Sequence, residues 1–162
     1  MRLVRTKIMK KILLGLFLIL GVVSFALPNY VSEEKIRNSG YEITDEEEFG
    51  FRIARQKNNG DATVILYYLD YPEVSSAKQL SEMSVKTAPE EFKFLDSTEN
   101  KRAYINKFVS PEDKGVYSFV GKKSKIKNCY IVIMHSTSKQ LSNSELTKTV
   151  DVLLDEAESY LK

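Results

Sequence analysis

The chain has 162 residues, and its 24 Lys and Arg against 22 Asp and Glu give a formal net charge of +2. Five of the 24 basic residues and none of the acidic ones lie in residues 1–26, so the remainder carries 19 against 22, a weakly acidic balance that argues against nucleic acid as a partner. One Cys excludes an intrachain disulfide and one His cannot form a His-based metal site, so we expect no metal and no cofactor.

Residues 12–26 are an uncharged apolar run that follows the five basic residues. A basic start, an apolar centre and small residues at the exit, here Ser24 and Ala26, are typical of a secretory signal peptide. We therefore predict that residues 1–26 are a signal peptide cleaved after Ala26, with no membrane span in the mature chain. The alternative is a retained anchor, but residues 12–27 are shorter than the roughly 20 residues that a spanning helix needs.

The predicted compartment follows from this segment. We expect an exported protein, periplasmic or extracellular, and the Lys-rich, Cys-poor composition favours a bacterial source. The mature chain is short enough for one domain and long enough to bury a core without disulfides. We divide it into a polar N-terminal segment, residues 27–48, and a single α+β domain, residues 49–162.

The first elements are a short helix and a hairpin. Ser32 and Gly40 are placed to begin and end a helix over residues 32–38. The acidic run 45–48 is interpreted as a solvated turn; its carboxylates are an alternative site for a hard cation. Strands are predicted over 49–55 and 63–69 around an Asn-Gly turn, and the second is apolar on both faces.

The central part predicts one more helix and three strands. A helix over residues 74–85 begins at Ser76, whose spacing to Gln79 fits a capping box, and Pro89 follows it. Three strands are then expected, over residues 92–95, 102–109 and 116–120.

The C-terminal part is the most strongly patterned. After a basic connection, residues 129–136 are apolar on both faces, which predicts a central strand. Ser142 and Glu145 form a capping box before an amphipathic helix that places Leu153 toward the sheet. We predict an α+β fold: a mostly antiparallel sheet of about six strands flanked by helices, with the C-terminal helix packed on the sheet.

This order of elements resembles the PsbP-like fold family of small exported proteins. The similarity lies in the early hairpin that begins Phe-Gly-Phe-Arg-Ile at Phe49, the helix after the second strand, and the closing apolar strand, Ser-rich turn and amphipathic helix. The resemblance implies an antiparallel sheet with helices on both sides. It rests on element order without a diagnostic motif, and it carries over no functional residue.

No catalytic constellation is evident, so we lean toward a protein that is not an enzyme. Cys129 and His135 would lie about 20 Å apart along one strand, too far to share a proton. Cys129 is best interpreted as a buried apolar residue, with a free thiol as the alternative. His135 at the strand end is interpreted as a surface or capping residue.

The basic connection is the remaining candidate site. Lys122, Lys123, Lys125 and Lys127 could contact an anionic surface, either lipid headgroups or an acidic partner. The interpretation that we favour is a soluble loop that keeps a neighbouring strand edge from pairing with other chains.

The sequence therefore favours a small exported, non-enzymatic binding or accessory module of the bacterial cell envelope, with a protein or another envelope component as partner. One alternative is an exported hydrolase built from carboxylates. Another is a carrier of a small apolar ligand, which requires a cavity between sheet and helix.

Overall fold

The computed structural model describes residues 27–47, 50–57, 62–70 and 74–162, so the predicted signal peptide lies outside the described residues. Seven strands form one sheet in the order β1-β2-β3-β7-β6-β5-β4, and all neighbouring strands are antiparallel. The predicted α+β fold is thereby confirmed. The strands are β1 (Glu42–Glu47), β2 (Gly50–Lys57), β3 (Ala62–Leu69), β4 (Lys93–Glu99), β5 (Ala103–Val109), β6 (Gly115–Gly121) and β7 (Tyr130–Thr137).

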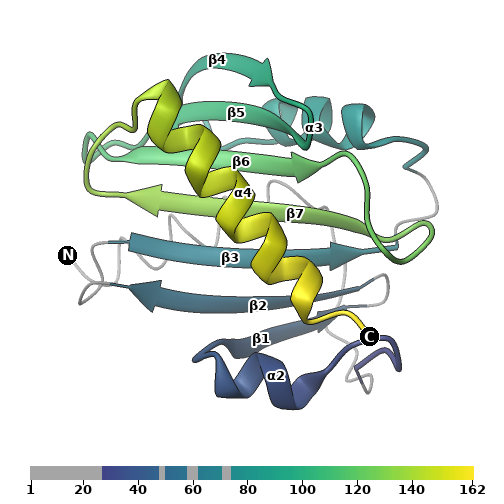
Figure 1. The fold of residues 1–162 in the computed structure, drawn as a ribbon. Coiled ribbons are helices and arrows are strands. Elements are labelled where there is room, and N and C mark those ends of the chain that lie inside the picture. Colours follow the sequence, from purple (N-terminus) through teal and green to yellow (C-terminus); the bar gives the residue numbers. More distant parts are fainter. Residues whose placement is uncertain (1–26, 48–49, 58–61, 71–73) are drawn as a thin grey trace.

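Helices cover both faces of the sheet (Figure 1). Helix α4 (Asn143–Ser159) crosses one face, and α2 (Glu33–Asn38) packs into the same core. Helix α3 (Ala77–Lys86) lies on the opposite face, against β5 and β6. The predicted capping residues begin all three helices: the hydroxyls of Ser32, Ser76 and Ser142 each accept a hydrogen bond from a backbone N–H of the first turn.

The central strands are buried on both faces, as their apolar runs predicted. In β3, Leu66 and Tyr68 belong to the core under α4, whereas Tyr67 and Leu69 belong to the core under α3. Strand β7 alternates in the same way and lies fourth in the order, with three strands on either side. The prediction of a central C-terminal strand is therefore confirmed, and neighbouring β-branched and aromatic side chains stabilise both layers.

The acidic run 45–48 is where the sequence interpretation was wrong. The backbone of residues 45–47 continues edge strand β1, which pairs with β2 from Glu42↔Ala54 to Glu47↔Gly50. The interpretation as a turn failed because β1 has little apolar periodicity. Charged edge strands of this kind resist pairing with other chains. The alternative cation site on this run falls on side chains outside the described residues.

The other edge strand is longer than expected. Strand β4 extends over Lys93–Glu99, where only residues 92–95 were predicted. All seven of its residues are exposed, including Phe94 and Leu95, each at 44%. An exposed edge strand has no buried face to impose a pattern of apolar residues, so its second half was not recognised.

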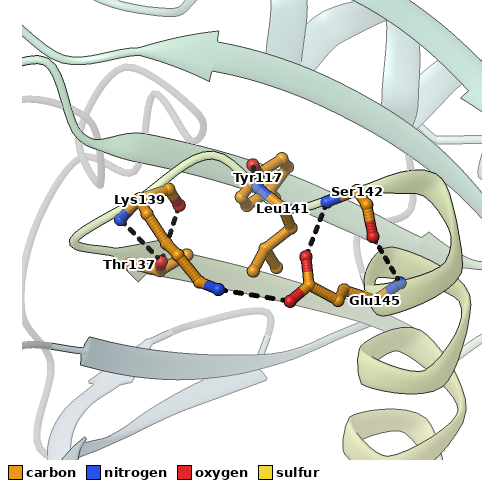
Figure 2. Close-up of polar contacts among 6 residues, drawn as sticks. All are labelled: Tyr117, Thr137, Lys139, Leu141, Ser142 and Glu145. Carbon is orange, nitrogen blue, oxygen red and sulfur yellow. Dashed lines mark hydrogen bonds and ion pairs between the residues drawn. The ribbon is translucent and has the colours of Figure 1, made fainter.

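The loop from β7 to α4 fixes the start of the long helix (Figure 2). The backbone N–H of Ser142 donates to the Glu145 carboxylate at 2.8 Å, and the backbone N–H of Glu145 donates to the Ser142 hydroxyl at 3.2 Å, which confirms the predicted capping box. The Tyr117 hydroxyl of β6 accepts a hydrogen bond from the backbone N–H of Leu141 at 2.7 Å. The loop is thus bonded to the sheet directly before the helix begins.

The two ends of the described chain are joined. Val31 and Leu161 form an isolated antiparallel bridge, and both are buried. The backbone N–H of Ser32 donates to Tyr160 O at 2.8 Å, and that of Lys162 donates to Tyr30 O at 2.8 Å. Of this N-terminal segment only the short helix was predicted; residues 27–47 also contribute a bridge and strand β1 to the domain.

Candidate functional site

A groove of about 550 Å³ lies between α3 and the β4–β5 edge of the sheet. Side chains of three elements line it: α3 on one side, β4 on the other, and β5 on the floor. They are Lys78, Ser81, Glu82, Val85, Lys86, Ser97, Thr98, Glu99, Tyr104 and Asn106. Because α3 packs on β5 and β6, the edge strand β4 is left beyond the helix, and the groove follows from this offset.

The helix side of the groove carries an alternating row of charges. Lys78, Glu82 and Lys86 are spaced four residues apart, so they share one face of α3, and all three are exposed. Neither Lys78 nor Lys86 forms an ion pair within the described part of the chain. The row therefore presents two cations that are free to meet a ligand.

The floor of the groove is a buried polar network centred on Asn106, which is 1% exposed. Its side-chain amide donates to Ser81 O and to the hydroxyls of Ser81 and Ser84, each at 3.1 Å. Its carbonyl accepts a hydrogen bond from the Ser97 hydroxyl at 2.7 Å. These bonds join α3 to β4 and β5, so the network fixes the helix relative to the edge strand and holds the groove open at a set width.

Two residues that line the groove, Glu99 and Tyr104, are contacted by the first lysine of the basic connection. Lys122 forms an ion pair with Glu99, and its ammonium lies 4.8 Å from the centre of the Tyr104 ring. The hydrogen bond and the positive charge of Lys122 lower the pKa of Glu99. Glu99 is therefore held in its charged form and is poorly suited to act as a general acid.

The structure divides the predicted lysine site. Lys122 is engaged by Glu99, whereas Lys123, Lys125 and Lys127 are exposed in the β6–β7 loop. The loop connects two interior strands of the sheet. The interpretation favoured from the sequence, that these lysines shield a strand edge, is therefore wrong, because neither β6 nor β7 is an edge strand.

Cys129 is a buried residue, 4% exposed, directly before β7. Burial raises the pKa of its thiol to about 11, and Tyr30 is a near neighbour of the thiol. A thiol that stays protonated at neutral pH is a poor nucleophile. His135 lies near the other end of the strand, where its Nδ1 is 3.3 Å from Thr63 O, so the two residues do not meet.

Three further findings limit the site. Among the described residues, no group of three or more His, Cys, Asp and Glu could hold a metal ion. The apolar pocket between α3 and the sheet has a volume of about 10 Å³, the space of a single water, which leaves no room there for an apolar ligand. The described helices include none with the length and hydrophobicity needed to cross a membrane.

The comparisons with known proteins identify no family. No family model matches the chain, and no curated protein matches it. Among solved structures, the chain is similar to the crystal structure of the extracellular domain of PknH from Mycobacterium tuberculosis, with 12% identity and a TM-score of 0.35. That match covers 80% of this chain and 72% of the other.

The sequence did not predict the groove. Its walls come from α3 and β4 and its floor from β5, three elements that are separate in the sequence. The only local signal was the four-residue spacing of Lys78, Glu82 and Lys86, which any solvated helix face also shows.

Proposed function

We propose that the protein is a small exported binding or accessory module of the bacterial cell envelope, and that it binds a partner protein in the groove between α3 and β4. The observation that carries the proposal is the groove itself, an open surface with two unpaired lysines on one side and a fixed polar floor. The signal-type sequence of residues 1–26 supports export. The resemblance to the PsbP-like family is likewise a proposal, since no family model matches the chain.

The charges of the groove favour an acidic segment on the partner. Glu99 is already neutralised by Lys122, so Lys78 and Lys86 face a single unpaired acid, Glu82. An incoming carboxylate can therefore pair with either lysine, and such charge complementarity selects the partner more than it adds affinity.

The shape and borders of the groove favour a protein over a small molecule. Small-molecule sites enclose most of their ligand, whereas this groove is open along the exposed strand β4. Phe94 and Leu95 of that strand offer apolar contact area next to the polar groove. A protein surface can cover both regions at once.

A carboxylate-based hydrolase is the second candidate, because two carboxylates, those of Glu82 and Glu99, line the same groove. Turnover of a substrate by the purified protein, abolished by Glu82→Gln or Glu99→Gln, would establish this candidate and contradict the non-enzymatic proposal.

Site-specific photo-crosslinking in the producing cells tests the binding proposal. A photoreactive residue at Thr98, which lines the groove, is expected to form an adduct with a partner protein through an acidic segment of that protein. The same residue at Val152, 60% exposed on the outer face of α4, is the matched control and should form none.

Charge reversal completes the test. Lys78→Glu combined with Lys86→Glu should remove the Thr98 adduct, whereas the equally charged pair Lys114→Glu and Lys148→Glu, outside the groove, should leave it. An adduct that persists after reversal in the groove, or the absence of any adduct at Thr98, would contradict binding at this site.

A further inference from the structure

The β6–β7 loop is the most basic uninterrupted surface segment of the described chain. Lys123, Lys125 and Lys127 are exposed, and no acidic residue lies between Gly121 and Tyr130. None of these three lysines has an ion pair in the described structure. The loop therefore presents three unneutralised positive charges to whatever faces this end of the sheet.

The first described residues of the chain, from Leu27 on, lie at the same end of the sheet as the β6–β7 loop. Tyr30 lies against Cys129 at the end of the loop, and Leu27, Tyr30 and Ile126 pack against one core cluster. The backbone bond between Lys162 and Tyr30 O brings the exposed side chain of Lys162 to this region as well. Figure 1 shows the C-terminus and the β6–β7 loop at the same end of the strands.

Residues 12–26, which directly precede Leu27, carry no charge. While such a segment is in a bilayer, Leu27 lies at the headgroup level, and Tyr30, three residues later, lies near Cys129 at the end of the loop, so the loop is held close to the headgroups too. We propose that Lys123, Lys125 and Lys127 contact anionic lipid headgroups and that this end of the domain faces the membrane.

The magnitude of the attraction is sufficient for orientation. Each lysine near an anionic leaflet contributes about fivefold to binding, so three contribute on the order of 100-fold. Removal of residues 1–26 would add the positive α-amino group of Leu27 to the same region. Contact with the membrane therefore does not depend on the apolar segment being retained.

Acidic groups at this end oppose the attraction only in part. Asp70 is exposed and close enough to raise the pKa of both Tyr30 and Cys129. The acidic end of β1 is farther away, because the Glu47 backbone is three strand spacings from Tyr130 through Gly50 and Leu69. Three spacings are about 14 Å, more than the Debye length of about 8 Å in physiological salt.

The test compares the full chain in nanodiscs of phosphatidylcholine alone with nanodiscs that also contain phosphatidylglycerol. The apolar segment is the same in both, so hydrogen–deuterium exchange of residues 121–129 reports the loop itself. We expect slower exchange of the loop in the anionic discs, and loss of this protection in high salt and in the triple variant Lys123→Gln, Lys125→Gln, Lys127→Gln.

The matched control is Lys93→Gln, Lys114→Gln, Lys148→Gln, which removes the same charge; Lys93 and Lys114 lie at the opposite end of the strands. It should keep the protection. Equal exchange of the loop in both lipids, or the same loss of protection in the control triple, would overturn the proposal. If the chain recovered from its cells begins at Leu27, co-sedimentation with vesicles of the same two compositions should show binding to anionic vesicles about 100-fold stronger than that of the loop variant; equal binding would likewise overturn it.

Discussion

At the scale of single residues, the buried side chain of Asn106 is explained by the hydrogen bonds that it forms between elements. Asn106 would be costly in an apolar core, yet all of its side-chain donors and acceptors in the structure serve to join α3 to β4 and β5. It gave no signal in the sequence, because an Asn between Ile105 and Lys107 in a strand is also compatible with a solvent-facing position. Its role depends on a helix that is distant in sequence.

Replacing Asn106 tests this role. In Asn106→Leu, Ser81, Ser84 and Ser97 lose a common partner inside the protein, and we expect the free energy of unfolding to fall by about 3 kcal/mol. Ser97→Ala removes one bond at the exposed rim and should cost about 1 kcal/mol. Urea denaturation of both variants measures the difference, and equal losses would contradict a central role for Asn106.

The thiol of Cys129 makes stability depend on alkaline pH. Burial raises its pKa in the folded protein from 9.0 to about 11. Between these values the unfolded chain releases the proton first and binds fewer protons, so the contribution is complete below pH 9 and is lost as the pH rises toward 11. Urea denaturation at pH 9 and pH 11 should show a larger loss of stability for the wild type than for Cys129→Ala. The variant is the control because its tyrosines still titrate. Identical losses in the two proteins would contradict a contribution from the thiol.

At the scale of elements, the buried helices and strands were predicted from the sequence more accurately than the exposed edge strands. Strands β3 and β7 were recognised because both of their faces are apolar and buried in the two core layers. Helix α4 was recognised because one stripe of it is apolar and a capping box marks its start. The edge strands were not: β1 was interpreted as a turn and β4 was predicted short, because an edge strand selects charge and exposure instead of apolar alternation. The groove lies beside one of these edges, which is one reason why it was not foreseen.

Two adjacent residues of α4 provide a matched test of its packing face. Leu153 is 3% exposed and faces the sheet, whereas Val152 is 60% exposed. Leu153→Asp places a charge in the core and is expected to cost about 4 kcal/mol or to prevent folding. Val152→Asp should change stability by less than about 0.5 kcal/mol. Thermal unfolding of both variants decides the matter, and similar melting temperatures would mean that the packing face is assigned wrongly.

At the scale of the whole molecule, the two ends of the described chain complete one core. Ile36 of α2 is 0% exposed and Arg55 of β2 pairs with Glu156 of α4 at 2.8 Å, with its guanidinium 4.2 Å from the centre of the Tyr41 ring. The pair of Arg55 and Glu156 connects residues 101 positions apart in sequence. No local pattern announces them, which is why residues 27–48 were separated from the domain on composition alone.

Truncation tests whether residues 49–162 can fold without residues 27–48. A chain that begins at residue 49 loses strand β1 and the buried side chains of Val31, Ile36 and Tyr41, and it leaves Arg55 without the ring that covers it. Each such side chain contributes about 1.5–3 kcal/mol, so their sum approaches the 5–15 kcal/mol typical of a whole domain. We expect a chain that begins at Leu27 to unfold cooperatively in urea and the chain that begins at residue 49 to show no cooperative transition. A cooperative transition in the shorter chain would mean that residues 49–162 are an independent domain and that the joined termini are an accessory contact.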